Sequence, residues 1–312
     1  MSKKVSLIVV AWNNLAYTKL FLWSIRSWTR WPYQLIFVDN GSTDGTREYL
    51  SQQEDVKLIV NKTNRGYSAA VNQAIEQVKT DYFCLLNNDL VVSPSWLTDL
   101  MEFFLKHPKI GQLTCNSNGI IDAKTPLGHV SFASWMNFKK EHSRFSAKRL
   151  WQDYYGNWEE FIATNKKKNR RNVDFLKAPP QFLGGWCLLM RKSILEKIGP
   201  WLYDPRFKIA YWEDVDLSWR VGLAGYQLAV LRSVFIHHFV NTSAVNLSKR
   251  YRWIEWENRN RFFDKWNDYL TSYVKKKTGG DQKKIRNLIY AQYVIKRFRD
   301  YLGEKAMGNL VK

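Results

Sequence analysis

The chain has 312 residues, of which 45% are hydrophobic and 24% charged, as is ordinary for a globular protein of one large or two smaller domains. Its three widely spaced cysteines argue against a disulfide framework and indicate buried thiols in the reducing cytoplasm. No apolar run approaches the ~20 residues of a membrane-spanning helix. The net charge of +20 indicates a polyanionic partner, namely nucleic acid, an anionic membrane or a phosphorylated substrate, or else a solvated basic surface.

The first hundred residues alternate between apolar runs and amphipathic segments. The β-branched apolar runs predict buried strands at Val5–Val10, Leu35–Val38, Val56–Val60 and Tyr82–Leu86. The segments after them predict helices at Leu15–Trp28, Thr43–Gln53, Ser68–Val78 and Pro94–Phe104. This alternation is typical of an α/β fold with an open, mostly parallel sheet flanked by helices. The first run is too short for the hydrophobic region of a signal peptide, so we interpret it as a strand.

The middle of the chain is less regular. Lys139–Arg171 is basic and aromatic without strand alternation, and it predicts a partly helical insertion over about residues 137–178. Ordered elements then resume, with strands expected at Trp186–Met190, Gln227–Leu231 and Val234–His237 and helices at Ser193–Ile198 and Ser218–Leu223.

From Asn246 onward the pattern is helical and basic. Large apolar residues recur there at steps of three and four, namely Phe263, Trp266, Leu270 and Tyr273, and Gly279-Gly280 precedes a last helix. This stripe either packs on the rest of the protein or forms, with the flanking lysines and arginines, a surface for anionic lipids. We therefore expect a main domain, residues 1–245, and a helical C-terminal extension, residues 246–312.

Polar side chains follow three of the predicted strands. Asn13 follows the first strand, Asp39 ends the second, and Asn87-Asn88-Asp89 follows the fourth. Because ligands of parallel sheets bind beyond the carboxyl ends of the strands, these residues predict a site, although a single Asp such as Asp39 also serves as a helix cap. Asp89 beside amide side chains suits a hard divalent cation. No phosphate-binding Gly-rich motif of the P-loop or dinucleotide type is present.

Three acids lie close together in the segment YWEDVDLSWR. At least one of these acids should have a raised pKa, because Glu213, Asp214 and Asp216 repel one another. Partial burial between Trp212 and Trp219 would act in the same direction. A carboxylate of raised pKa is a competent general base, and we assign this role to Asp214. The alternative is a helix N-terminus that favours acids through its dipole, which is the interpretation for Asp216.

Two adjacent histidines end the segment VFIHH. Neighbouring residues of a strand point to opposite faces, so only one of them can reach a site at the strand end. One of the two is therefore a candidate metal ligand that completes the site of Asp89, and the strand period leaves open which.

The chain resembles the family 2 glycosyltransferases of GT-A fold over roughly residues 5–243. The resemblance lies in the order of several motifs: VSLIVVAWNN, IFVDNGSTDGT, NRGYSAAVNQAI, FCLLNNDLVVSPSWL, FLGGWCLLMRKSILEKIGPW, YWEDVDLSWRVGLAGY and VFIHH. It implies an inverting transferase that uses a nucleoside-diphosphate sugar, UDP- or dTDP-linked, with Mg²⁺ or Mn²⁺. The family's first motif acid is Asn87 here, which keeps a sugar-nucleotide binder without turnover as an alternative.

The resemblance also implies roles for individual residues. The donor would be bound by Ala11, Asn13, Asp39, Asn64, Gly66, Asn87, Asn88, Gly185 and Trp186, with Asp39 accepting a hydrogen bond from the pyrimidine base. Asp89 and His237 would hold the metal on the diphosphate, with His238 as the alternative to His237. Asp214, beside Glu213, would be the general base. The insertion would be either a lid over the acceptor or a solvated loop.

The implied acceptor is a hydroxyl of a glycan, of a lipid-linked sugar or of a protein, in bacterial cell-surface glycan synthesis. Such an enzyme would work in the cytoplasm, either free or held at the inner face of the plasma membrane. A basic protein that binds nucleic acid or membranes is the competing class, because aromatic residues among lysines also stack on bases. We do not expect nucleic acid as the partner, because that interpretation leaves the acidic strand ends unexplained.

Overall fold

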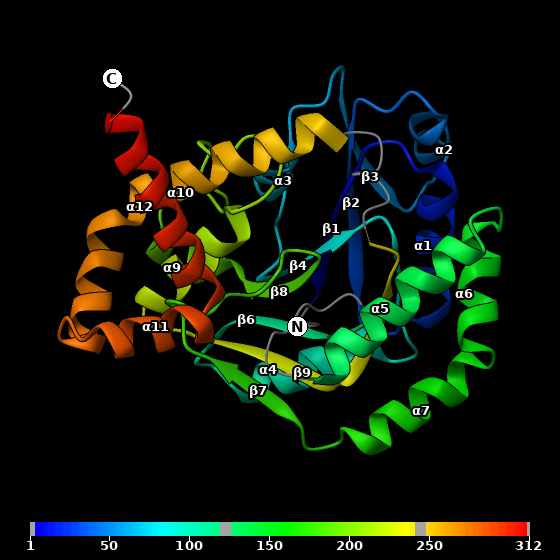
Figure 1. Cartoon of the computed structure of the whole chain (residues 1–312). Coiled ribbons are helices and arrows are strands. Elements are labelled where there is room, and N and C mark those ends of the chain that lie inside the picture. The colour runs from blue at the N-terminus through cyan, green and yellow to red at the C-terminus, as the bar shows by residue number, and fades with distance from the viewer. Residues whose placement is uncertain (1–3, 119–125, 241–247, 311–312) are drawn as a thin grey trace.

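The computed structural model of the chain describes residues 4–118, 126–240 and 248–310, and is built around one nine-stranded sheet (Figure 1). The strand order is β3-β2-β1-β4-β8-β6-β9-β5, with β7 paired to β9. The strands are β1 (Val5–Ala11), β2 (Tyr33–Asn40), β3 (Val56–Asn61), β4 (Tyr82–Asn87), β5 (Leu90–Val91), β6 (Ile110–Ser117), β7 (Val173–Leu176), β8 (Cys187–Arg191) and β9 (Gln227–His238). The expected α/β class is confirmed.

Helices flank this sheet. In the first half they are α1 (Leu15–Trp28), α2 (Thr46–Ser51), α3 (Tyr67–Ile75) and α4 (Trp96–Lys106). The middle of the chain contains α5 (Pro126–Glu141), α6 (Ala147–Tyr155), α7 (Trp158–Lys168), a short 3₁₀ turn (Lys192–Ile194), α8 (Leu195–Ile198) and α9 (Glu213–Leu223). The C-terminal helices are α10 (Ser248–Thr278), α11 (Gln282–Ala291) and α12 (Tyr293–Leu310). No described helix is both long and apolar enough to cross a bilayer.

The two halves of the sheet differ in strand direction. β3, β2, β1 and β4 run parallel, as predicted, whereas β8 is antiparallel to both β4 and β6. The sequence did not indicate β6, because its polar residues break the apolar pattern although nearly all of them are buried. The two strands expected over residues 227–237 form the single strand β9. Its register against β6 shifts at Cys115/Asn116, where residues 232–234 of β9 are not paired with β6.

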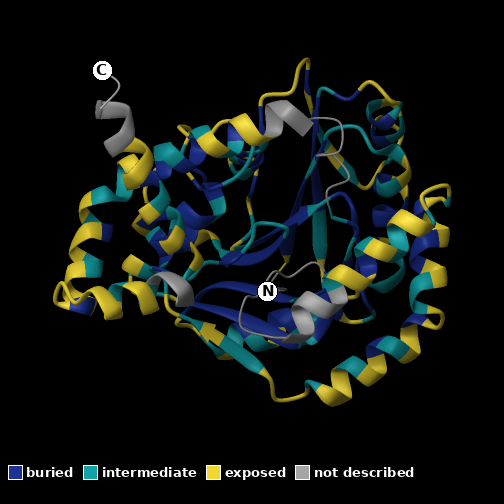
Figure 2. Cartoon of the chain, in the orientation of Figure 1, coloured by how far each residue is buried: buried dark blue, intermediate teal, exposed yellow. Residues whose placement is uncertain are grey.

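Apolar side chains of the sheet form a core on each face. Leu7 and Val9 of β1 belong to one cluster and Ile8 to the other, as the alternation of side chains along a strand requires. Because both faces are covered, the parallel strands are continuous apolar runs, and buried residues concentrate in the sheet (Figure 2). Cys84, Cys115 and Cys187 are free and buried, as expected.

The described part of the insertion is packed and is not a solvated loop. Trp135, Trp151 and Trp158 of α5, α6 and α7 are buried in a cluster that also contains Leu20 of α1 and Phe235 of β9. The insertion thus covers the side of the sheet opposite the C-terminal helices (Figure 1). Burial of large aromatic side chains, worth about 1.5–3 kcal/mol each, anchors it there.

The C-terminal helices pack on the sheet domain, which confirms the first of the two interpretations of the apolar stripe. Phe263 and Leu270 of α10 are fully buried in a cluster with Trp212, Val215 and Trp219, at or within α9. The single last helix expected after Gly280 is instead two helices, α11 and α12, which separate at Gln292. The C-terminal helices therefore share an apolar cluster with α9.

Candidate active site

The carboxyl ends of β1, β2 and β4 lie side by side at one edge of the sheet. In the strand registers Ala11 is paired with Asp39, and Val10 with Asn87. The polar residues that follow these strands are therefore neighbours in space, as the sequence predicted.

A hydrogen-bonded pair of loops follows β1 and β2. The backbone N–H of Asn13 donates to Ser42 Oγ at 2.8 Å, and that of Thr43 donates to Asn13 Oδ1 at 2.8 Å. Asp39 is fully buried, with Oδ1 accepting from the Ser42 N–H at 3.2 Å and Oδ2 from Arg47 Nε at 2.9 Å. In this structure Asp39 therefore holds the loop and is not open to a ligand, so a contact with a base requires Arg47 to move.

The loop after β3 is tied to this one by an asparagine that the sequence did not single out. Asn40 Nδ2 donates to Asn64 Oδ1 at 2.9 Å, and Asn64 Oδ1 also accepts from the Gly66 N–H at 2.8 Å. Gly66 has φ +85°, and a Cβ on it would lie 2.6 Å from the backbone nitrogen of Ile209. Only glycine permits this approach of the segment that precedes α9.

Asp89 and His238 face each other across the short β5–β9 pairing. His238 Nε2 lies 3.2 Å from Asp89 Oδ1, and the Trp186 ring stacks on the His238 ring with centroids 5.6 Å apart. Asn118, which sequence reasoning missed, holds His238 in place: its Oδ1 accepts from the His238 N–H at 2.8 Å and its Nδ2 donates to the His238 carbonyl at 3.0 Å.

His237 points to the other face of β9, away from this pair. It is fully buried against Trp135 and Phe239, and Tyr155 Oη lies 3.0 Å from its Nδ1. Burial holds the pKa of His237 well below its usual range, so this imidazole is neutral. Our assignment of His237 is therefore replaced by the alternative, because His238 is the histidine that lies beside Asp89.

Asn87 and Asn88 have different surroundings. Asn87 Nδ2 lies 3.4 Å from His238 Nε2, whereas Asn88 is buried and donates to Thr18 Oγ1 at 2.9 Å, which fixes α1. The described residues contain no group of three or more His, Cys, Asp or Glu that could hold a metal. A carboxylate and an imidazole nevertheless suit Mg²⁺ or Mn²⁺ when substrate phosphates supply further oxygens, so Asp89 and His238 fit such an ion.

Two carboxyl groups begin α9. Burial, and then the charge of Asp214, raises the pKa of Glu213 to about 8, and Glu213 Oε2 has no partner among the described residues. Burial also raises the pKa of Asp214 to about 6, against the opposing effect of backbone N–H groups, one of which donates from Val215 at 2.8 Å. At neutral pH Glu213 is thus mainly protonated and Asp214 ionised, as a general base must be.

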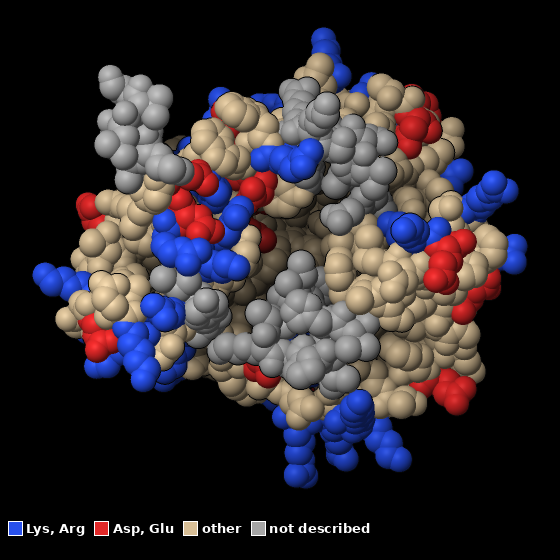
Figure 3. Space-filling model, in the orientation of Figure 1, with Lys and Arg blue, Asp and Glu red and all other residues tan. Residues whose placement is uncertain are grey.

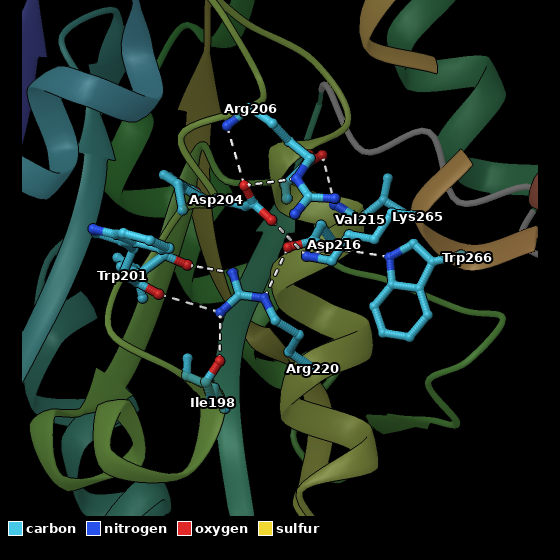
Figure 4. Close-up of polar contacts among 12 residues, drawn as sticks. Ile198, Trp201, Asp204, Arg206, Val215, Asp216, Arg220, Lys265 and Trp266 are labelled. Atoms are coloured by element: carbon cyan, nitrogen blue, oxygen red, sulfur yellow. Dashed lines mark hydrogen bonds and ion pairs between the residues drawn. The ribbon is translucent and has the colours of Figure 1, made fainter. Parts of the chain in front are cut away.

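Asp216 has a structural role. Its fully buried carboxylate accepts from Arg220 Nε at 2.8 Å and Trp266 Nε1 at 3.0 Å, and Lys265 Nζ lies 2.6 Å away (Figure 4). Arg220 in turn donates to the carbonyls of the turn after α8, those of Ile198, Trp201 and Leu202. Asp216 therefore joins α9 to α10 and is more than a helix cap.

One short segment, residues 184–186, lies against both acidic groups. A Cβ on Gly184 would lie 3.9 Å from Asp214 Oδ2, and Trp186 stacks on His238, the partner of Asp89. Asp89 and Asp214, 125 residues apart in sequence, are therefore both linked to this segment, Asp89 through His238. The face in Figure 3 is hollowed near its middle, with acidic atoms at the left margin of the hollow.

Two tyrosines that sequence reasoning missed line this segment. Tyr67 Oη donates to the Gly185 carbonyl at 3.2 Å, and a Cβ on Gly185 would lie 2.6 Å from Tyr203 Oη. Burial, and then the charges of Glu213 and Asp214, raises the pKa of Tyr67, so it remains a neutral hydrogen-bond donor. Gly185 is thus required by close packing, and no sequence motif shows which side chains surround it.

Comparison with known proteins is consistent with this geometry. The model of the family "Glycosyl transferase family 2" matches residues 6–199. The chain is 24% identical over 253 residues to N-acetylglucosaminyl-diphospho-decaprenol L-rhamnosyltransferase of Mycobacterium tuberculosis, covering 76% of each protein.

Two solved structures share the fold. Residues 1–349 of S. aureus TarS align with a TM-score of 0.51 at 14% identity, over 98% of this chain and 92% of that one. GalNAc-T7 with UDP, GalNAc and Mn²⁺ aligns with a TM-score of 0.52 at 13% identity, over 75% of this chain but only 43% of that one.

Proposed function

Because the chain belongs to glycosyl transferase family 2, we propose that it transfers a sugar from a UDP- or dTDP-linked donor to an acceptor hydroxyl with inversion. The observation that supports this proposal is that residues 184–186 lie against both groups: Gly184 faces Asp214 Oδ2, and Trp186 stacks on His238, the partner of Asp89. Inversion in one displacement needs a group that takes the acceptor proton and, apart from it, groups that stabilise the leaving diphosphate.

Asp214 is the general base of the proposed reaction. It takes the proton of the acceptor hydroxyl while the oxygen attacks the anomeric carbon and the bond to the diphosphate breaks. Glu213, protonated at neutral pH, lies beside it with a free Oε2 that can hydrogen bond to the acceptor or the sugar. Its neutral state also avoids a second negative charge, which would raise the pKa of Asp214 further.

Asp89 and His238 form the diphosphate end of the site. A Mg²⁺ or Mn²⁺ ion held by them would offset the negative charge that develops on the leaving diphosphate. Trp186 and Gly185 line the sugar pocket. The nucleotide base lies against three loops, those of Asn13, of Asp39 and of residues 64–66. Hydrogen bonds of Asn13 join the first two loops, and those of Asn40 join the second to the third. In this arrangement Ala11, Asn87 and Asn88 support the donor pocket from the strand ends.

We further propose a bacterial cell-surface glycan as the product. The name of the mycobacterial relative describes a sugar carried by a lipid diphosphate as acceptor. A lipid-linked acceptor would place the enzyme at the inner face of the plasma membrane, on its cytoplasmic side.

A donor screen tests the function. Purified protein should release nucleotide from one member of a panel of UDP- and dTDP-sugars, faster with acceptor than without it, and faster with Mg²⁺ or Mn²⁺ than with EDTA. Released nucleotide is measured directly, and NMR of the product gives the anomeric configuration. Tight binding of a sugar nucleotide without turnover for any acceptor class would favour the degenerate binder instead.

Exposed aromatic residues support the membrane proposal. Trp253 and Trp256 of α10 are 58% and 40% exposed and stack with centroids 5.1 Å apart. Indole side chains favour the membrane interface, and basic residues of α10 to α12 add attraction to anionic lipids. We expect binding to vesicles that rises with anionic lipid and falls several-fold in W253A/W256A. Co-sedimentation measures it; no binding at low salt would remove this proposal.

A further inference from the structure

The backbone that leads into α9 is strained. Ile209, Tyr211 and Trp212 have φ values of +66°, +78° and +70°. Left-handed backbone is unfavourable for residues other than glycine, above all for a β-branched one such as Ile209, and it persists only where surrounding contacts impose it. Glu213 and Asp214 follow directly, so this segment sets where the two carboxyl groups point.

One side chain of the C-terminal helix α10 makes four hydrogen bonds to this segment. Asn258 is fully buried, and its Nδ2 donates to the carbonyls of Lys208, Ala210 and Tyr211 at 2.7, 2.8 and 3.2 Å. Its Oδ1 accepts from the Lys208 N–H at 3.2 Å. The Asn258 amide thus makes hydrogen bonds to four backbone groups of three residues, Lys208, Ala210 and Tyr211. Three of these groups are carbonyls that lie outside any helix or strand.

Other contacts fix α10 relative to α9, so that Asn258 is itself held. Lys265 Nζ lies 2.7 Å from Asp204 Oδ2 and 2.6 Å from Asp216 Oδ1, and Trp266 Nε1 donates to Asp216 (Figure 4). Trp212 also donates from Nε1 to Glu255 Oε1 of α10 at 3.2 Å.

Apolar packing alone does not account for the conformation. The Trp212 ring packs on Phe262 and Phe263 with centroids 5.0 and 5.2 Å apart, which places its side chain. Such contacts are not directional and leave the carbonyl directions of residues 208–211 open, whereas hydrogen bonds depend steeply on direction. The amide of Asn258 therefore fixes the carbonyl directions of Lys208, Ala210 and Tyr211, while the Tyr67 N–H, which donates to the Ile209 carbonyl at 2.6 Å, fixes that of Ile209.

We propose that Asn258 is a positioning residue: by clamping residues 208–211 it aims Asp214 at the acceptor, and α10 is thereby a part of the active site. This inference rests on the proposed transferase function. It also explains why the C-terminal helices pack on α9 and do not form a separate unit.

The test compares N258A and N258D with N267A. Asn267 lies on the same helix and, among the described residues, its side chain donates to the adjacent Asp268 alone. N258D keeps the acceptor for the Lys208 N–H but turns a carboxylate oxygen toward three carbonyls. We expect kcat to fall about 100-fold in both Asn258 variants, with the donor KM within about threefold, because the diphosphate end is untouched. N267A should retain wild-type kcat and KM.

A second measurement uses the wild-type protein and so does not depend on a variant that folds. In hydrogen–deuterium exchange the amide of Lys208 should exchange as slowly as those of α9. A rescue experiment is also informative. The I209G substitution removes the β-branched residue from left-handed backbone, so the double variant N258A/I209G should have a kcat at least about tenfold above that of N258A.

Three results would overturn the positioning role of Asn258. The first is a folded N258D or N258A variant with kcat within threefold of wild type, the second is an equal loss of kcat in N267A, and the third is fast exchange of the Lys208 amide. If no donor is turned over by the wild type, the transferase proposal fails, while the exchange experiment still decides whether Asn258 orders the segment.

Discussion

Replacing Asp214 by asparagine should lower kcat by about 10³-fold while the donor KM stays within about threefold, as expected when a general base is lost. Asparagine has nearly the same volume and its oxygen can still accept the Val215 N–H, so the start of α9 should be preserved. What it cannot do is take a proton. Steady-state kinetics at saturating acceptor, with thermal unfolding as a check of the fold, measures the effect.

The pH profile provides the independent evidence for this assignment. Burial raises the pKa of Asp214 to about 6, and only its ionised form accepts a proton, so wild-type kcat/KM should fall as pH drops below about 6. Burial, and then the charge of Asp214, raises the pKa of Glu213 to about 8. Ionisation of Glu213 should therefore lower kcat/KM at high pH. Both limbs belong to the pair of carboxyl groups. A flat profile from pH 5 to 9, or a D214N variant with normal kcat, would refute the role.

A matched control is available at the opposite end of the strands. Asp55 precedes β3 at the amino edge of the sheet and forms an exposed ion pair with Arg26. D55N removes a carboxylate of the same type, and such a pair contributes at most about 1 kcal/mol to stability. It should leave kcat and KM unchanged, which separates the loss of a base from the loss of any negative charge.

The parallel half of the sheet, and the grouping of polar residues at the ends of its strands, could be predicted from the sequence because both depend on local patterns. Leu15–Trp28 was predicted at its observed bounds, since a turn at Asn13-Asn14 and an amphipathic period are visible in the residues alone. β6 was missed because its Gln112 and Thr114 look polar, yet they are buried, and nothing in the sequence shows that neighbouring strands cover them.

The remainder of the site depends on contacts between distant segments. That only one of His237 and His238 reaches the site follows from the strand period, but which one depends on the pairing of β5, a two-residue strand, with β9. Asn118 and Asn258 act through amide hydrogen bonds to backbone groups, 120 and about 50 residues away in sequence. Such a bond requires no motif, so only the fold reveals it.

The second large effect is expected for a substitution at the diphosphate end of the site, at Asp89. D89N should lower kcat/KM by about 10²- to 10³-fold and weaken binding of the free nucleoside diphosphate, because it removes a buried carboxylate that faces His238. The loss differs in kind from that of D214N, which should bind nucleotide normally. Calorimetric titration with the diphosphate, with and without Mn²⁺, distinguishes the two variants: we expect the metal to strengthen binding to wild type and not to D89N.

The two histidines give this prediction its internal control. H238A should share the nucleotide-binding defect of D89N, because His238 Nε2 lies 3.2 Å from Asp89. H237F should bind nucleotide normally, since phenylalanine fits among Trp135, Tyr155 and Phe239, and should lose only the stability of one hydrogen bond, about 1 kcal/mol. If instead H237F loses nucleotide binding and H238A does not, the diphosphate lies on the other face of β9. Asp89 would then act on the donor only through the fold of its strand.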